Sequence, residues 1–307
     1  MTGGPEAADD LRPLLFSIAY RMLGTVTDAE DVVQEAFLRL QRAAVQGAEV
    51  GSPRGFLTTV TTRLAIDQLR ASRRARETYF GPWLPEPLVT VEESDPAELA
   101  EMSDSLSLSF LVLLETLSPV ERAVFLLRQV FDFGYDEIAE IVDKSEANCR
   151  QLFVRAQRHI DAGRTRFEVD REQQETLTSK FIEAVQEGEV AGLVERLAED
   201  VVFYGDGGGK GRGLPRPVYG RANVGRLLER FVASYHEVAS RMIPAEVNRE
   251  PAVLALDAEG RLINVFAFEI ADGAVQTVRS IINPDKLAHL GYPLSPLGRP
   301  DGQEPPR

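Results

Sequence analysis

The beginning of the chain carries apolar residues at helical spacing in three successive stretches. These are 11–23, 28–40 and the segment that starts at Pro53, and each places its apolar side chains on one face while polar residues occupy the other. Proline suits the first turn of a helix, which fits the third stretch. We therefore expect three helices within a first domain at residues 1–78.

The stretch 28–40 predicts a helix with a well-specified start. Thr27 followed three residues later by Glu30 has the spacing of a capping box, and acidic residues in the first turn favour the positive end of the helix dipole. The side chains expected to face outward are Glu30, Asp31, Gln34, Glu35, Leu38 and Arg39. Periodicity alone fits an ordinary bundle helix, so the pattern by itself assigns no partner to this face.

A second helical domain is predicted at residues 106–167. Ser118 is an N-cap residue ahead of one helix, Gly134 interrupts the chain before another, and Ser145 caps the last. The last two helices have the spacing of a helix-turn-helix motif, whose second helix enters the major groove of DNA. Its outward side chains are Asn148, Arg150, Gln151, Arg155 and Arg158. Arginine, asparagine and glutamine can bind base edges with paired hydrogen bonds, so this helix is suited to reading DNA.

Residues 79–105 connect the two helical domains. The four prolines at positions 81–99 exclude a regular helix or a central strand there. Trp83, the only tryptophan, and Leu84 and Leu88 are too apolar for a spacer that only crosses solvent. We expect this part of the linker to dock on another part of the protein.

The remainder of the chain is patterned as helices followed by strands. Helices are expected at 172–193, with a further short one ending at Ala198, and at 220–234; strands are expected from Val201, and at 237–247, 252–257, 262–270 and 274–283. Helices followed by a run of antiparallel strands indicate an α+β domain with a curved sheet, at residues 168–290. Residues 291–307 are rich in proline and glycine and predict a disordered tail.

Charge is distributed unevenly along the chain. The formal net charge of −14 disfavours binding to nucleic acid by the chain as a whole, because phosphate binding depends on Lys and Arg. Residues 54–76, however, contain six arginines and one acid, and residues 145–166 contain five arginines and two acids. Residues 79–107 contain seven acids and no base. Two basic segments separated by an acidic connector favour contact with nucleic acid at two places.

The composition also excludes several classes. No apolar run approaches the roughly 20 residues of a membrane span, and the acidic N-terminus differs from a signal peptide, so we expect a cytoplasmic protein without membrane contact. Cys149 is the only cysteine, so no internal disulfide can form, and its place on an apolar stripe indicates a core thiol. The three histidines lack metal-binding spacing, and we expect no metal and no other cofactor.

Four segments together resemble a known family. They are DAEDVVQEAF from Asp28, AIDQLR from Ala65, LSPVERAVFLLRQVFDFGYDEIAEIV from Leu117 and RQLFVRAQRHI from Arg150. In this order they resemble bacterial RNA polymerase sigma factors of the extracytoplasmic-function class. The resemblance implies that the chain binds core RNA polymerase, through the β′ clamp and the β flap, and directs promoter-specific transcription initiation. It also implies that the chain is not an enzyme.

The resemblance assigns roles to individual residues of the helical domains. The residues that would bind the polymerase clamp are Asp31, Gln34, Glu35 and Leu38. The residues of the third helix that would bind the promoter strand melted at the minus-ten element are Arg63, Asp67, Arg70, Arg73 and Arg74. The minus-thirty-five element would be bound by Asn148, Arg150, Gln151, Arg155 and Arg158. Promoter DNA is therefore the second implied partner.

The C-terminal part resembles a SnoaL-like, nuclear-transport-factor-2-like cup fused to a sigma factor, the sigma-J type. The motifs are WLPEPL in the linker, DGGGK at 206–210 and NPDKL at 283–287. Glycines let backbone approach a neighbour closely, so we expect DGGGK and NPDKL to hold the linker and to modulate activity in place of a separate anti-sigma factor. The residues assigned to this contact are Trp83, Leu84, Pro85, Asp206, Gly207, Gly208, Gly209, Lys210, Asn283, Pro284, Asp285 and Lys286.

Other functions stay open for the cup, including the binding of a small ligand. Relatives of the fold include isomerases and cyclases, and Asp206, Tyr204, Asn264 and Arg279 are the candidates for such chemistry, although no paired acid and base stands out. GDGGGKG differs from a phosphate-binding loop, because Tyr204 replaces its first glycine and Gly211 replaces its Ser or Thr. The alternative function is a helix-turn-helix regulator with a ligand-sensing or vestigial enzymatic cup.

Overall fold

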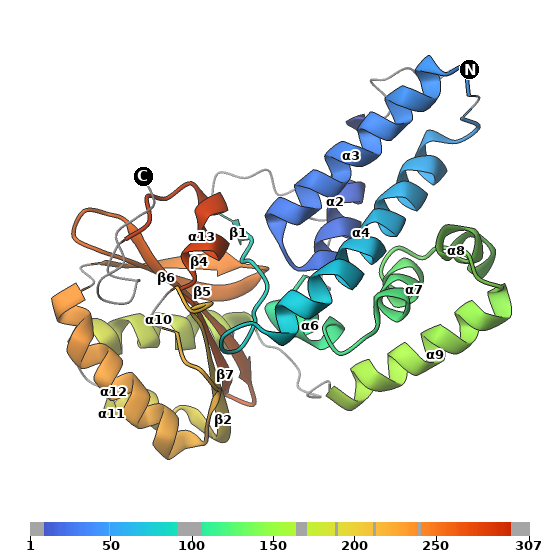
Figure 1. Cartoon of the computed structure of the whole chain (residues 1–307). Coiled ribbons are helices and arrows are strands. Elements are labelled where there is room, and N and C mark those ends of the chain that lie inside the picture. The colour runs from blue at the N-terminus through green and yellow to red at the C-terminus, as the bar shows by residue number, and fades with distance from the viewer. Residues whose placement is uncertain are drawn as a thin grey trace. The chain divides into compact units, whose positions relative to one another are not determined.

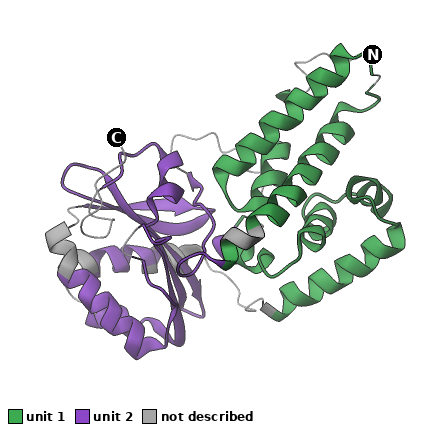
Figure 2. Cartoon of the chain, in the orientation of Figure 1, with its two compact units in different colours: residues 1–77, 95–106, 110–164 green, residues 78–94, 107–109, 165–307 purple. Residues whose placement is uncertain are grey.

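The computed structural model divides the chain into two compact units (Figure 2). It describes residues 9–48, 50–90, 106–163, 171–187, 190–210, 213–238 and 241–295. Unit 1 comprises residues 1–77, 95–106 and 110–164, and unit 2 comprises residues 78–94, 107–109 and 165–307. In the described part, no helix is both long and apolar enough to cross a membrane.

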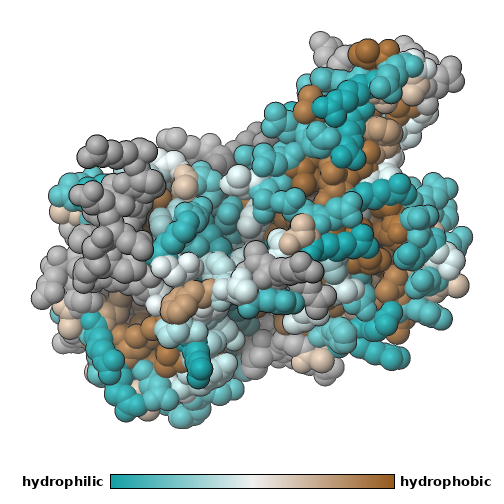
Figure 3. Space-filling view, viewed as in Figure 1, coloured by the Kyte–Doolittle hydropathy of each residue, from teal (hydrophilic) through white to brown (hydrophobic). Residues whose placement is uncertain are grey.

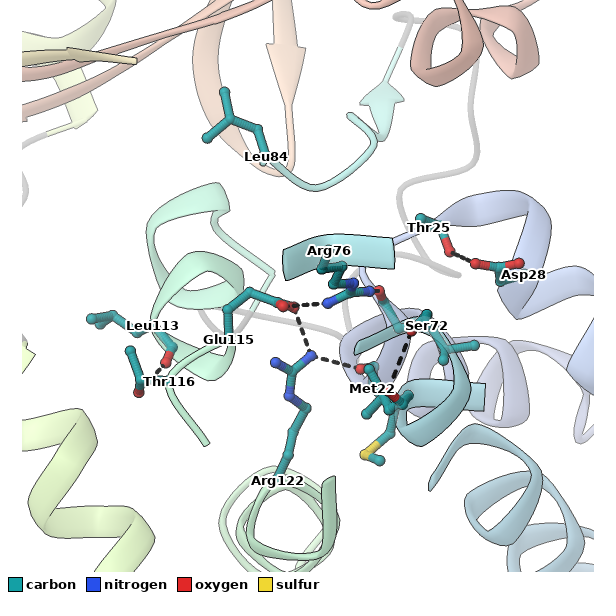
Figure 4. A network of polar contacts seen from close by, with 12 residues as sticks. Met22, Thr25, Asp28, Ser72, Arg76, Leu84, Leu113, Glu115, Thr116 and Arg122 are labelled. Carbon is teal, nitrogen blue, oxygen red and sulfur yellow. Dashed lines mark hydrogen bonds and ion pairs between the residues drawn. The ribbon is translucent and has the colours of Figure 1, made fainter. Parts of the chain in front are cut away.

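Unit 1 begins with the three predicted helices, which pack against one another (Figure 1). They are α2 (Arg12–Leu23), α3 (Val26–Val45) and α4 (Pro53–Glu77). Gly24 ends α2 in the left-handed conformation, with φ of 72°. The predicted capping box at Thr27 is wrong, because α3 begins at Val26 and Thr27 lies inside the helix. The residue before the helix is Thr25, whose hydroxyl instead donates to the Asp28 carboxylate at 2.6 Å (Figure 4).

The second helical group contains four helices among the described residues. They are α6 (Leu108–Leu114), α7 (Pro119–Gln129), α8 (Tyr135–Val142) and α9 (Glu146–Gly163). The predicted caps at Ser118 and Ser145 are confirmed: Ser118 forms a capping box with Glu121, and Ser145 Oγ accepts from the Asn148 N–H at 3.3 Å. Asp143 makes the tight turn between α8 and α9 in the left-handed region, with φ of 54°. The two helices therefore form the predicted helix-turn-helix.

The two helical groups pack together within unit 1. Helix α7 contacts α2 and α4, and α8 contacts α4. Apolar side chains of unit 1 are almost fully buried, among them Leu15, Met22, Leu57, Leu111 and Leu126. The sequence pattern predicts two helical domains, and it carries no information on whether the apolar faces of the two pack on each other.

The described residues of unit 2 form a seven-stranded sheet in the order β1-β4-β5-β6-β7-β2-β3. The strands are β1 (Val89–Thr90), β2 (Leu197–Asp206), β3 (Val218–Tyr219), β4 (Arg241–Val247), β5 (Glu250–Leu256), β6 (Leu262–Ala271) and β7 (Ala274–Ile281). Neighbours are antiparallel except β2 and β7, which are parallel. The expected short helix is present as α11 (Ala191–Val194), but its predicted end at Ala198 is wrong, because β2 already begins at Leu197.

The two faces of the sheet are covered differently. Helices α10 (Arg171–Glu187), α11 (Ala191–Val194) and α12 (Arg221–Val238) lie together along one side (Figure 1). Phe181 of α10 and Val224 of α12 share that core with Phe266 and Phe268 of β6. Alternate strand residues point to the other face, which carries Asp206 at the end of β2. Strand β7 continues into the short helix α13 (Pro284–Leu287) and the 3-10 turn η1 (Ala288–Leu290).

Part of the predicted tail is ordered. The Leu262 N–H donates to Pro293 O at 2.8 Å, and the Ser295 N–H donates to Leu262 O at 2.9 Å. These bonds place the first residues after 291 alongside the start of β6. Residues 296–307 lie outside the described part of the chain.

Candidate functional site

The outward face of α3 is polar and accessible, as the pattern predicts. Asp31, Gln34 and Leu38 are exposed, and Glu35 is half-buried. Arg39 Nε donates to Glu35 Oε1 at 2.8 Å, and this hydrogen bond holds the pKa of Glu35 below its ordinary value. In the space-filling view, hydrophilic residues cover much of the arm formed by α3 and α4, with hydrophobic residues between them (Figure 3). The face can therefore meet a partner without rearrangement of α3.

The α4 residues that the sequence assigns to DNA are not equally available. Asp67 and Arg70 are exposed and paired at 3.1 Å. Arg63 points to α8: its Nε donates to Ile141 O and its Nη2 to Glu140 O, each at 2.8 Å. The side chains of Arg73 and Arg74 lie outside the described residues. One candidate DNA contact is thus occupied within unit 1.

The outward side chains of α9 lie as predicted. Asn148, Arg150, Gln151, Arg155 and Arg158 are all exposed, while Cys149, Ala156 and Ile160 are buried. The Arg150 guanidinium stacks on the Tyr135 ring, 4.3 Å from its centroid, and pairs with Glu146 at 3.1 Å. Arg155 Nε lies 2.9 Å from Glu121 Oε1. These contacts fix two arginines in defined orientations on the surface of the helix-turn-helix.

The linker is held at Asp206, which has no exposed surface. Its Oδ2 accepts hydrogen bonds from the Leu84 N–H at 2.8 Å and from Lys286 Nζ at 2.7 Å, and its Oδ1 accepts one from the Tyr79 hydroxyl. Lys286 also donates to Leu84 O and lies 4.2 Å from the centroid of the Trp83 ring. Asp206 and Lys286 therefore bind both the N–H and the C=O of Leu84.

A glycine, Gly208, and the side chain of Asn283 complete this contact, which we call the linker site. A Cβ on Gly208, whose φ is 58°, would lie 2.3 Å from Asn283 Nδ2 and 2.9 Å from the Tyr79 hydroxyl, so only glycine fits there. Asn283 Nδ2 donates to that hydroxyl at 2.9 Å. Burial and the adjacent Asp206 carboxylate raise the pKa of Tyr79, so the tyrosine stays protonated as a donor. Lys210 pairs with Asp285 at the exposed rim.

Three residues of the linker site were not identified from the sequence. They are Tyr79, Asn248 and His289. Asn248 exchanges two hydrogen bonds with the backbone of Leu88, at 3.0 and 2.8 Å, and His289 Nε2 lies 2.8 Å from Pro87 O. The positive φ of Asn248, 52°, marks a tight turn between β4 and β5, but its contact with the linker has no local signal.

Of the candidates for enzymatic chemistry, Asp206, Asn264 and Arg279 make contacts within the domain, although two nitrogens of Arg279, Nε and Nη1, are buried without a hydrogen-bond partner among the described residues. Asp206 is enclosed by three donors and reaches no solvent. Asn264 and Ser280 exchange hydrogen bonds, and Arg279 pairs with Glu269 at 2.7 Å. In the described part of the chain, no group of three acidic, histidine or cysteine side chains is arranged to hold a metal. The arrangement is suited to holding a chain segment.

Comparison with known proteins identifies the helical part. The family described as Sigma-70 region 2 matches residues 7–75, and that described as Sigma-70, region 4 matches residues 107–160. The chain is 34% identical over 305 residues to the ECF RNA polymerase sigma factor SigJ of Mycobacterium tuberculosis, covering 94% of this chain and 96% of SigJ. The chain belongs to the extracytoplasmic-function RNA polymerase sigma factors.

The similarity extends beyond the two sigma regions. The probable sigma factor SigI of the same species is 34% identical over 281 residues, covering 91% of this sigma factor and 93% of SigI. The crystal structure of SigJ superposes with a TM-score of 0.74 at 33% identity, over 94% of this chain and 98% of that one. The predicted family and the predicted fold class, helical regions followed by an α+β domain, are confirmed. A helix-turn-helix regulator lacking region 2 would not explain the match over residues 7–75.

Proposed function

We propose that this sigma factor docks on the β′ clamp of core RNA polymerase through the outward face of α3. The observation that supports this is the exposure of Asp31, Gln34 and Leu38 on a helix that region 2 of the family contains. Region 4 would meet the β flap and would present α9 to the minus-thirty-five element. In this role the sigma factor directs promoter-specific initiation.

Replacing Asp31 by arginine is expected to weaken binding to core RNA polymerase at least tenfold. The substitution reverses charge in the centre of the proposed face, and like charges across an interface are strongly unfavourable. Titration of fluorescently labelled full-length protein with core polymerase measures the affinity. Glu229→Arg is the matched control, because Glu229 is equally exposed on α12 of unit 2. Equal affinities of the two variants would place the docking face elsewhere.

The C-terminal domain would modulate the sigma factor through the linker site. Supporting this are the backbone contacts of Asp206 and Lys286 with Leu84, since they restrain the segment that joins regions 2 and 4. A regulator within the same chain acts at high effective concentration, so a separate anti-sigma factor would not be required. No substrate chemistry is part of this proposal.

The double substitution Trp83→Ala and Leu84→Ala is expected to change promoter-dependent transcription at least twofold while leaving the affinity for core polymerase unchanged. Both residues belong to unit 2, where the Trp83 ring lies against Lys286 Nζ and Leu84 is only 1% exposed. Transcription in vitro from a cognate promoter, with the variant and wild type at saturating concentration, gives the comparison. Phe80→Ala is the control, since Phe80 is 58% exposed in the same segment. Unchanged transcription would argue against modulation through the linker.

A further inference from the structure

Three polar atoms on the sheet of unit 2 are buried without a hydrogen-bond partner among the described residues. They are Nε and Nη1 of Arg279 on β7 and Oε2 of Glu250 on β5. The Arg279 side chain is only 6% exposed, so bulk water does not replace the missing partners. Buried donors and acceptors are almost always paired in proteins, because an unpaired one keeps the full cost of its desolvation. These atoms therefore mark a place suited to binding a further polar group.

Strand pairing brings the three atoms to one place. Ala252 of β5 and Arg279 of β7 both pair with Ala267 of β6, from its two sides. Because alternate residues of a strand share a face, Glu250 and Glu269 lie on the same face of the sheet as Arg279. Arg279 Nη2 donates to Glu269 Oε2 at 2.7 Å, in agreement with this placement. We call Glu250, Glu269 and Arg279 the β-face cluster.

The β-face cluster also binds the first residues of α6. The Ser109 hydroxyl lies 3.0 Å from Glu269 Oε2 and 3.4 Å from Glu250 Oε1, and the Leu108 N–H donates to the Glu250 carboxylate. Both residues belong to unit 2, at the point where region 4 begins. A molecule bound to the cluster would therefore act on the segment that leads into region 4.

The charges of the β-face cluster favour a neutral ligand. Glu269 already compensates the Arg279 guanidinium, so an anion would bring a further charge into a buried place that holds two carboxyl groups. Burial raises the pKa of Glu250 to about 7, with a contribution from Glu269 and an opposing one from Arg279. A second anion would compete with the ionised form of Glu250, whereas a neutral group adds no charge to the cluster.

The unpaired atoms have the hydrogen-bonding pattern that complements a carboxamide. Nε and Nη1 of Arg279 are donors, and the ionised Glu250 Oε2 is an acceptor. A carboxamide offers a carbonyl oxygen with two lone pairs and an NH₂ group with two donors. A carboxylate of the same shape offers acceptors alone, and one of them would face Glu250 Oε2 without a hydrogen between them.

We propose that the β-face cluster binds a small neutral molecule through its carboxamide group, whose oxygen accepts from Arg279 and whose nitrogen donates to Glu250 Oε2. Glu269 is 22% exposed, so one side of the cluster is open to solvent and admits a small molecule. A ligand that binds only the ordered cluster stabilises it, and residues 107–109 are then held more firmly on unit 2. The regulatory meaning of this effect rests on the proposed modulation by the C-terminal domain, but the binding does not.

The test is a titration of the full chain with acetamide at pH 8. The ¹H–¹⁵N signal of the Arg279 Nε–H, identified by its loss in Arg279→Lys, reports whether this donor gains an acceptor. We expect a saturable shift with a dissociation constant in about the millimolar range, as suits a ligand with so few heavy atoms. Acetate has the same shape but lacks N–H donors, and it should bind at least tenfold more weakly. At saturating acetamide, hydrogen exchange of the Leu108 N–H should slow at least threefold.

Matched variants locate the binding. Saturation-transfer NMR on the acetamide methyl group should show at least tenfold weaker binding to Arg279→Lys, which keeps the charge but loses the guanidinium donors. Arg230→Lys makes the same change at an exposed position of α12 and should bind like the wild type. If Arg279→Lys lowers the strand content, the acetamide and acetate titrations of the wild type decide, because both use the unaltered protein.

The contrary outcomes are distinct. An Arg279 Nε–H signal that does not shift means that ordered water alone pairs these atoms, and it overturns the site. Equal affinities for acetamide and acetate overturn the carboxamide as the ligand group, and unchanged exchange of the Leu108 N–H overturns the effect on region 4. Unchanged transcription with Trp83→Ala and Leu84→Ala would leave the binding result untouched, so the two proposals fail separately.

Discussion

Replacing Asp206 by asparagine is expected to lower the free energy of unfolding of unit 2 by about 3 to 5 kcal/mol, the cost of removing one partner of a buried ion pair. Asp206 is 0% exposed and the Lys286 side chain is 6% exposed. Asparagine keeps the shape of the side chain but removes the charge that compensates the Lys286 ammonium. The same substitution weakens the hydrogen bond that residue 206 accepts from the Leu84 N–H. We therefore expect the linker to dissociate at a lower denaturant concentration than the one that unfolds the sheet.

The single tryptophan makes this measurement direct. The centroid of the Trp83 ring lies 4.2 Å from Lys286 Nζ at the linker site, so tryptophan fluorescence reports release of the linker. Far-ultraviolet circular dichroism reports unfolding. Denaturant titration of the full chain with both probes gives the two free energies. Asp285→Asn is the matched control: its pair with Lys210 is exposed, and such pairs contribute roughly 0 to 1 kcal/mol. Equal effects of the two substitutions would contradict the central role of Asp206.

The stability of unit 2 is expected to fall as the pH rises from about 4.5 to about 7, and Glu250 is the cause. Its Oε2 is buried without a hydrogen-bond partner, and burial, with a further contribution from Glu269, raises its pKa to about 7 against the opposing effect of Arg279. The folded state therefore holds the proton more tightly than the unfolded state. From the shift between those two values we expect a loss of about 3 kcal/mol across this window and no further loss above it.

Glu250→Gln isolates that contribution. The amide mimics the protonated acid, so the variant should match the wild type near pH 4 and exceed it by about 3 kcal/mol at pH 8, the size of the linkage contribution. Unfolding free energies of the two proteins are measured at several pH values. Their difference cancels the contributions of the other titrating groups. Glu229→Gln, an exposed position on α12, controls for the loss of one negative charge. Parallel pH profiles for Glu250→Gln and the wild type would show that Glu250 does not carry the dependence.

Glu250 also connects this linkage to the beginning of region 4. The Leu108 N–H donates to its carboxylate, and the Ser109 hydroxyl lies 3.4 Å from Glu250 Oε1 and 3.0 Å from Glu269 Oε2. Residues 107–109 belong to unit 2. Unit 2 therefore binds the chain twice before region 4 begins, first at the linker site and then at residues 107–109. These hydrogen bonds favour the charged carboxylate, so they oppose the rise in the pKa of Glu250 that burial causes.

Local features of the sequence predicted local features of the structure. The helix-turn-helix, the caps at Ser118 and Ser145 and the outward faces of α3 and α9 follow from periodicity and capping chemistry, which act over a few residues. The requirement for glycine at position 208 was also predictable, because a run of glycines indicates that the backbone approaches a neighbour closely. The Thr27 prediction failed because two threonines, at 25 and 27, precede acidic residues, and spacing alone does not choose between them.

Contacts between distant segments could not be predicted in the same way. Arg63 reads as a surface arginine in the sequence, and only the packing of α4 on α8 shows that it binds carbonyl groups. Tyr79 and His289 bind partners about 200 positions away in the sequence, for which no periodic pattern exists. The parallel pairing of β2 with β7 could not be predicted for the same reason, because the relative direction of two strands depends on how distant segments come together in the fold.

Strand β1 has a consequence for the solution behaviour of the molecule. Its two residues pair with Val247 and Glu246 at the outer edge of β4, and Pro244 removes one backbone donor further along that edge. A linker that leaves the sheet uncovers unpaired backbone at the end of β4, and such edges pair with strands from other molecules. The tendency of this protein to self-associate should therefore rise with the fraction of chains whose linker is undocked.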